Sequence, residues 1–156
     1  SSLDRDLVRY PVEIVARTIE PSVWSFDADA GGWQPDIDIG EFAVGDGVLR
    51  IVSTGGDPYM STTGLSIPAE YSTVTITMAV DGPDNFAQLF FHSDDQPDYT
   101  DDTVIGFEVV GGGEMRTYEL DMSTIPTWDG QITALRLDPV TTGTTTIEID
   151  EITVGP

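Results

Sequence analysis

The sequence of 156 residues contains no cysteine and no lysine, and only one histidine. The missing cysteine excludes disulfides, a zinc site with thiolate ligands and a cysteine nucleophile. The longest apolar runs span only a few residues, far short of the 20 or so that a membrane-spanning helix needs. The charged first residues also lack the apolar stretch of a signal peptide. A secreted form would therefore have lost its signal, or the chain is a module of a longer protein.

Positive charge is scarce. The chain has six arginines and 28 acidic residues, which gives a net charge of -22. This composition disfavours binding to nucleic acids or to anionic membranes, because those partners require a positive field. An acidic chain without lysine suits a protein that stays hydrated in concentrated salt, where screening relieves the repulsion between like charges. The composition predicts a halophilic or marine origin; the alternative is an acidic secreted protein from a GC-rich genome.

The length and the hydrophobic fraction of 39% are sufficient for one domain with its own core. Residues 21–156 carry the regular pattern. Residues 1–20 show only weak periodicity, and we interpret them as a linker or an added edge strand. No internal repeat and no second domain is evident.

Alternating apolar and polar residues indicate β-strands throughout the regular part. In Ser72–Val80, for example, valine, isoleucine and methionine share one face while threonines occupy the other. No segment keeps an amphipathic period of 3.6 over three turns. The pattern predicts an all-β protein, a β-sandwich or jelly roll of about nine antiparallel strands. The expected strands are 23–26, 47–52, 59–67 (interrupted near Gly64), 72–80, 85–92, 104–110, 115–122, 132–138 and 145–154.

The order of short motifs along residues 24–154 resembles carbohydrate-binding modules of the jelly-roll, galactose-binding-domain-like type. Such modules are often appended to secreted polysaccharide-degrading enzymes. The resemblance is specific for the fold and much less so for the ligand. The motifs that carry it are Phe26-Asp27, Gly32-Trp33, Gly47-Val48-Leu49, Asp57-Pro58-Tyr59, Ile67-Pro68-Ala69 with Tyr71, Leu89-Phe90-Phe91, Tyr118-Glu119-Leu120-Asp121, Trp128-Asp129-Gly130, Leu135-Arg136-Leu137-Asp138-Pro139 and Ile149-Asp150-Glu151-Ile152.

In many of these modules a structural calcium ion ties the first strand to the last. The resemblance therefore implies a Ca²⁺ site at Asp27 and Asp150, with Asp29 as a third ligand. Carboxylates and turn carbonyls are the oxygen ligands that calcium prefers. The alternative is that these residues are only turn and strand-end carboxylates. The acidic segment 94–102 lacks EF-hand spacing, and we interpret it as a salt-adapted surface loop.

Strand alternation also predicts which polar residues share the outer face of a sheet. If Leu89 and Phe91 enter the core, their neighbours along the strand point outward, and the same reasoning applies to the two strands at 104–110 and 132–138. Sugar binding requires hydrogen-bonding groups beside an aromatic ring. The alternative is an ion pair between the arginine and the glutamate that merely covers the sheet. The residues expected to share one concave surface are Gln88, Phe90, His92, Glu108 and Arg136.

Aromatic residues beside turns offer a second kind of sugar platform. Tyr59 and Trp128 lie next to Gly, Pro or Asp turns, as does Trp33. Such residues either contact the ligand at the end of the sandwich or cap the core at a corner. Tyr59 and Trp128 are therefore predicted ligand-binding residues, with the corner as the alternative.

The function expected from the resemblance is a non-catalytic module that holds a secreted, extracellular enzyme on a polysaccharide or oligosaccharide, with a neutral glycan as the simplest ligand. The expected partners are that glycan and a linked catalytic domain in a longer parent chain, and we expect a monomer. One alternative is a structural or adhesion module of a cell-surface protein. Another is a glycan hydrolase or lyase. The segment Glu148-Ile149-Asp150-Glu151 resembles a laminarinase-type catalytic strand, but its second glutamate does not lie four or five residues after the first.

Overall fold

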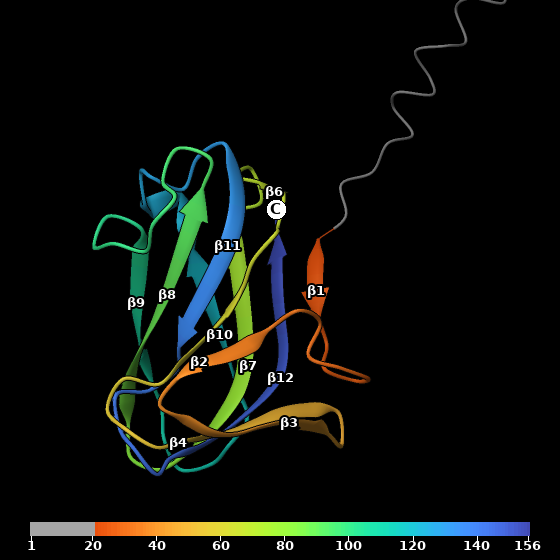
Figure 1. Ribbon diagram of the computed structural model, residues 1–156, viewed down its shortest axis with the longest axis vertical. Helices are drawn as coiled ribbons and strands as arrows, with labels where there is room; N and C mark the ends of the chain where they lie inside the picture. Colours follow the sequence, from red (N-terminus) through yellow and green to blue (C-terminus); the bar gives the residue numbers. More distant parts are fainter. Residues whose placement is uncertain (1–20) are drawn as a thin grey trace, which may run out of the picture.

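The computed structural model describes residues 21–156, which form two antiparallel six-stranded sheets packed as a sandwich (Figure 1). The expectation for residues 1–20 lies outside the described residues. No helix within residues 21–156 is long and apolar enough to cross a membrane. The elements are β1 (Ser22–Trp24), β2 (Gln34–Ile37), β3 (Ile39–Gly45), β4 (Val48–Ser53), β5 (Tyr59–Thr62), β6 (Ile67–Pro68), β7 (Thr73–Asp81), β8 (Asn85–Ser93), β9 (Val104–Val109), β10 (Arg116–Asp121), the 3-10 turn η1 (Met122–Thr124), β11 (Gln131–Asp138) and β12 (Thr146–Gly155).

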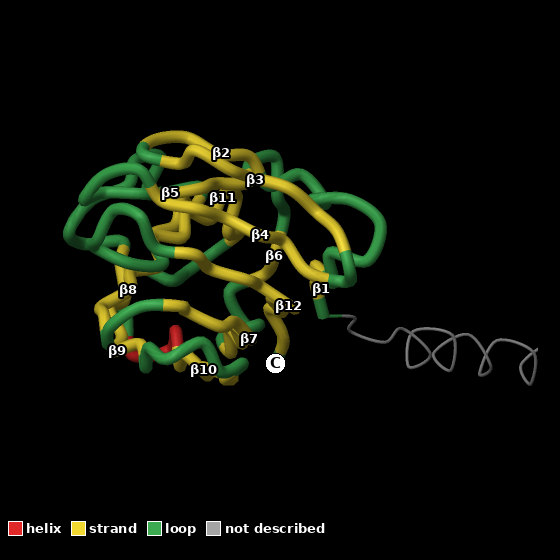
Figure 2. The backbone as a smooth tube through the Cα atoms, turned by 90° about the horizontal axis from the view of Figure 1, so that it is seen from below, coloured by secondary structure: helices red, strands yellow, loops and turns green. Residues whose placement is uncertain are grey.

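The first sheet, which we call sheet A, has the order β10-β7-β12-β4-β3, and β1 also pairs with β12. The second, sheet B, has the order β2-β5-β11-β8-β9, and β6 also pairs with β11. In Figure 2, β7 and β10 of sheet A lie at the bottom of the view, whereas β3, the edge strand of sheet A, lies at the top beside β2 of sheet B. The all-β sandwich predicted from the alternation is confirmed.

Residues 21–156 form twelve strands rather than about nine. Two strands, β2 and β3, are absent from the prediction, and the segment expected at 59–67 is divided into β5 and β6. Both missed strands lie at sheet edges. β2 contains Pro35 and is exposed throughout, and β3 contains glycine at two positions. Edge strands tolerate such residues, so their sequences lack the usual strand signal.

The core lies between the sheets and is filled by alternate residues of each strand. In β8, Ala87, Leu89 and Phe91 are fully buried, as the alternation predicted for the last two. In β7, the same pattern buries Val74, Ile76 and Met78. The intervening residues of β8 consequently face outward from sheet B.

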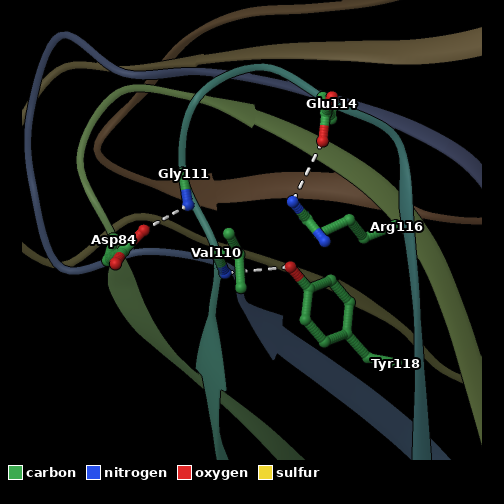
Figure 3. A network of polar contacts seen from close by, with 6 residues as sticks. All are labelled: Asp84, Val110, Gly111, Glu114, Arg116 and Tyr118. Atoms are coloured by element: carbon green, nitrogen blue, oxygen red, sulfur yellow. Dashed lines mark hydrogen bonds and ion pairs between the residues drawn. The ribbon is translucent and has the colours of Figure 1, made fainter.

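The free edges of the two sheets are joined where β9 of sheet B leads into β10 of sheet A (Figure 3). The Val110 amide donates to the Tyr118 hydroxyl at 3.0 Å, and the Gly111 amide donates to Asp84 Oδ1 at 2.8 Å. Arg116 forms an ion pair with Glu114 at 3.0 Å across the same connection. These contacts hold the connection in place with local polar groups, and none of them comes from the outer face of sheet B.

Candidate functional site

The outer face of sheet B brings together polar and aromatic residues from three neighbouring strands. Arg136 of β11 lies opposite Phe90 of β8 and Ser61 of β5. Two residues further along β11, Asp138 lies opposite Gln88, and in the other direction Ala134 lies opposite His92. Because side chains two residues apart share a face, this register places Arg136 and Asp138 beside the outward residues of β8.

Arg136 is fixed by a two-pronged ion pair with Asp138. Its Nε donates to Oδ1 at 2.9 Å and its Nη2 donates to Oδ2 at 2.8 Å. The two side chains are only 18% and 7% exposed. Parallel hydrogen bonds of this kind fix the plane of the guanidinium as well as its position.

Aromatic rings surround the guanidinium of Arg136. Its central carbon lies 3.5 Å from the ring centroid of Tyr59, 4.6 Å from that of Phe90 and 5.8 Å from that of Tyr99. A cation over an aromatic face is attracted by the ring's quadrupole, with an energy of about 0.5–2 kcal/mol. The guanidinium is therefore positioned by both Asp138 and the rings.

Tyr99 lies in the loop between β8 and β9, and its ring lies close to both Arg136 and His92. Its ring stacks on His92 with centroids 3.9 Å apart and planes 28° apart. Its hydroxyl is buried and has no hydrogen-bond partner within residues 21–156. The loop is held by hydrogen bonds between Thr100 and Thr103: the Thr103 amide and hydroxyl donate to the Thr100 carbonyl, and the Thr100 amide donates to the Thr103 hydroxyl. We call Tyr59, Phe90, His92, Tyr99, Arg136 and Asp138 the outer-face cluster.

Partial burial shifts the pKa values of His92 and Tyr99. It lowers the pKa of His92 below its ordinary value of 6.5, and the negative charge of Asp98 opposes this shift. Burial raises the pKa of Tyr99 to about 12, helped by the negative charge of Asp36 and opposed by Arg136. At neutral pH, both rings are therefore uncharged groups that can donate or accept hydrogen bonds.

Burial and the partner's charge shift the pKa values of Arg136 and Asp138 in opposite directions. Burial alone would lower the pKa of Arg136, but the hydrogen bonds and the charge of Asp138 raise it. Burial raises the pKa of Asp138, the Arg136 guanidinium opposes this, and the charge of Asp57 adds to the rise. The two short parallel hydrogen bonds require an ionised carboxylate, so we take the pair to be ionic at neutral pH.

Of the five residues predicted to share one concave surface, four lie close together on sheet B and Glu108 lies apart from them. Gln88, Phe90, His92 and Arg136 lie on the outer face of sheet B, as the alternation indicated. Glu108 is exposed on the same face, but it lies opposite Phe86, towards the other end of β8. The alternative of an Arg136–Glu108 ion pair is wrong, because Arg136 pairs with Asp138.

Trp128 is not a platform at the end of the sandwich. It is 6% exposed, and its Nε1 donates to the backbone oxygens of Ala69 at 3.1 Å and Tyr71 at 3.3 Å. Its ring packs edge-on against Phe91, with centroids 5.0 Å apart. The prediction that Trp128 contacts a ligand is therefore corrected: the ring caps the core at a corner, and we leave it out of the site. Tyr59, the other predicted aromatic, lies in the outer-face cluster.

Two members of the cluster were absent from the predicted site. Asp138 has a sequence signal, because it follows Arg136 by two residues in a strand and so shares its face. Tyr99 has none, because it belongs to an irregular loop whose path over the sheet depends on tertiary packing. The acidic residues around it had suggested only a solvated surface.

The carboxylates predicted to bind calcium lie near β1 and β12. Asp29 Oδ1 accepts a hydrogen bond from the Gly31 amide at 2.9 Å. Asp150 is exposed at a bulge in β12, where the register with β7 shifts between Ile149 and Glu151. Within residues 21–156, no three His, Cys, Asp or Glu side chains gather closely enough to hold a metal ion. The Ca²⁺ site at Asp27, Asp29 and Asp150 stays a prediction.

Comparison with known proteins agrees with this architecture. No protein-family model and no curated protein sequence matches the chain, whereas solved structures do. The chain has the fold of carbohydrate-binding modules. A family 29 carbohydrate-binding module superposes with a TM-score of 0.62 at 13% identity, covering 88% of this chain and 92% of that one. Another structure from that family, complexed with cellulohexaose, has a TM-score of 0.60 at 13% identity, covering 88% and 92%.

A low-affinity xylan-binding module of family 86 from Roseburia intestinalis also matches, with a TM-score of 0.57 at 17% identity, covering 87% of this chain and 95% of that one. At such identities the similarity establishes the fold alone. The resemblance predicted from the order of motifs is thereby confirmed.

Proposed function

We propose that the chain is a non-catalytic module that binds a neutral glycan on the outer face of sheet B, at the outer-face cluster. The observation that carries this proposal is the guanidinium of Arg136, clamped by Asp138 and stacked 3.5 Å from the ring of Tyr59. The solved carbohydrate-binding modules of the same fold support the class of ligand.

The chemistry of the cluster suits a sugar. A sugar ring has an apolar face that packs on an aromatic ring, and hydroxyls at its edge that require donors and acceptors. Arg136 uses two of its N–H groups for Asp138 and keeps the remaining donors for a ligand. Because the guanidinium is already fixed, binding does not have to order it, and this lowers the entropic cost of association.

Charge favours a neutral ligand over a uronate or a sulfate. Each of the three arginines in residues 21–156 already forms an ion pair: Arg50 with Glu41, Arg116 with Glu114 and Arg136 with Asp138. An anionic ligand would have to compete with a carboxylate for each guanidinium. It would also approach a chain of net charge -22.

The proposed role is attachment rather than catalysis. Glycoside hydrolysis requires two carboxylates on either side of the scissile bond. The acidic residues of β12 belong to sheet A, where Glu148 lies opposite Arg50, and Asp138 is engaged by Arg136. A monomeric module tethered to a secreted catalytic domain would raise that domain's local concentration on polysaccharide. Its acidic surface would keep it soluble in a saline extracellular medium.

Affinity electrophoresis and calorimetry with xylan, glucomannan and mixed-linkage β-glucan test the proposal, with Tyr59→Ala paired against the control Tyr118→Ala. Tyr118 is a half-buried tyrosine at the edge between the sheets, away from the cluster. We expect Tyr59→Ala to weaken binding at least about tenfold, because it removes the ring under Arg136. Tyr118→Ala should leave affinity unchanged. No binding to any of these glycans by the wild type would favour a structural or adhesion module, and release of reducing ends would favour an enzyme; either result would overturn the proposal.

A further inference from the structure

A second exposed aromatic ring lies on the outer face of sheet B, apart from the outer-face cluster. Phe86 is an outward-facing residue near the start of β8 and is 44% exposed. Its ring lies over Gly106 of the edge strand β9, where a Cβ atom would overlap the end of the ring. The glycine thus allows the ring to lie on the strand.

The backbone that carries Phe86 is held firmly by Asn85. Asn85 Oδ1 accepts hydrogen bonds from the Phe86 amide at 3.0 Å and from the Thr141 amide at 2.8 Å. Its Nδ2 donates to the Thr142 hydroxyl at 3.0 Å. These hydrogen bonds attach the start of β8 to the connection between β11 and β12. They therefore fix the backbone that carries the exposed ring.

Strand register connects this ring to the outer-face cluster through a row of residues that crosses the strands, namely Gly106, Gln88, Asp138 and Tyr59. Gly106 lies opposite Gln88, and Gln88 lies opposite Asp138. Leu137 lies opposite Met60, so the next position in this antiparallel pair places Asp138 beside Tyr59. The row runs across four strands, β5, β11, β8 and β9, and its three spacings of about 4.8 Å add up to about 14 Å.

We propose that a linear neutral glycan crosses the strands along this row, with one sugar at Tyr59 and Arg136 and another on the ring of Phe86. The inference rests on the proposed function and adds the direction of the chain and a second contact. Between the two aromatic ends, the row offers the Gln88 amide, which donates and accepts hydrogen bonds towards sugar hydroxyls. A span of this length is covered by an oligosaccharide and not by a single sugar, so affinity depends on chain length.

The test compares a disaccharide and a hexasaccharide from each of three series, xylo-, cello- and manno-oligosaccharides, by calorimetry. The variants are Phe86→Leu, which keeps Gly106 covered but removes the flat ring, and Phe86→Trp, which enlarges it. The control is Val23→Ala, because Val23 is 51% exposed and belongs to β1 of sheet A. Thermal unfolding of each variant confirms that it is folded, and the NMR signal of His92, the single histidine, reports a ligand at the cluster end.

We expect Phe86→Leu to lower hexasaccharide affinity about tenfold and to leave disaccharide affinity and the His92 signal change intact. Phe86→Trp should raise hexasaccharide affinity, and Val23→Ala should change neither. If hexasaccharide affinity in Phe86→Leu equals that of the wild type, the inference is wrong, although binding that still requires Tyr59 would leave the proposed function standing. If no oligosaccharide of either length binds the wild type, the proposed function fails and the inference fails with it.

Discussion

Replacing Arg136 with methionine should destabilise the fold by leaving the Asp138 carboxylate without its partner. Methionine keeps much of the apolar stem of arginine but forms neither of the hydrogen bonds of 2.9 and 2.8 Å. The Asp138 side chain is only 7% exposed, so water can replace these hydrogen bonds only partly. Breaking a buried ion pair on one side costs about 3–5 kcal/mol. Because Arg136 keeps some exposure and the carboxylate can take up a proton, we expect a loss of about 3 kcal/mol in the free energy of unfolding.

A second substitution isolates the interaction itself. Asp138→Asn removes the carboxylate charge, so in the double variant Arg136→Met/Asp138→Asn no unpaired charge remains. We expect a coupling energy of about 2 kcal/mol in this double-mutant cycle, measured by urea unfolding at pH 7. Such a cycle separates the pair from the packing that each side chain makes alone.

The penalty should also depend on pH in a defined direction. Burial raises the pKa of Asp138 in the folded state, and losing Arg136 removes the positive charge that opposes this rise. A raised carboxyl pKa means that the folded state favours the protonated form, so its contribution to stability is present at low pH and is lost as the pH rises through the folded pKa. The deficit of Arg136→Met should therefore shrink on acidification. A deficit below about 0.5 kcal/mol at pH 7, or purely additive effects in the cycle, would refute the reasoning.

Four further predictions address other parts of the molecule. Trp128→Ala should cost about 3–5 kcal/mol in urea unfolding, because the ring is 6% exposed, while glycan affinity well below the unfolding temperature stays unchanged; a selective loss of affinity would return Trp128 to the site. The NMR titration of His92 should give a pKa below 6.5, and stability should fall with acidification through that pKa in the wild type but not in His92→Gln; a pKa at or above 6.5 would contradict the burial argument. Tyr99→Phe removes a buried hydroxyl without a partner in residues 21–156, so its unfolding free energy should equal the wild-type value or exceed it by about 1 kcal/mol; a loss above about 1 kcal/mol would mean that the hydroxyl has a partner. If Asp27 and Asp150 bind Ca²⁺, EDTA should lower the unfolding temperature of the wild type and not that of Asp27→Asn/Asp150→Asn; identical temperatures with Ca²⁺ and with EDTA would end the calcium prediction.

Much of sheet B could be predicted from the sequence, because its central strands obey a strict period of two. In β8, burial of Leu89 and Phe91 determines that Gln88, Phe90 and His92 face outward. The same rule places Arg136 on that face. Where one face of a strand is buried, a shift of one residue would expose the whole core side, and this is why the alternation is reliable.

The remaining features depend on tertiary contacts that no local pattern encodes. Strand β2 is exposed throughout and is defined only by pairing with β5. Spacing places Asp138 on the face of Arg136, but only the register shows that Glu108, the other acidic candidate, lies opposite Phe86 and away from Arg136. Tyr99 reaches the cluster from an irregular acidic loop. Trp128 lies beside a turn both in sequence and in space, but packing against Phe91 decides that its ring points inward.

The central place of β12 in sheet A has a consequence for biosynthesis. This strand pairs with β7 on one side and with β4 and β1 on the other, although it follows all of them in the chain. Until residues 146–155 have left the ribosome, β4 and β7 cannot be joined, and the apolar faces that they share with Ile147, Ile149 and Ile152 stay open to water and to chaperones. Sheet A is therefore expected to form only after β12 has emerged from the ribosome. A nascent chain arrested before Thr146 should be sensitive to protease, and one arrested after β12 has emerged should be resistant.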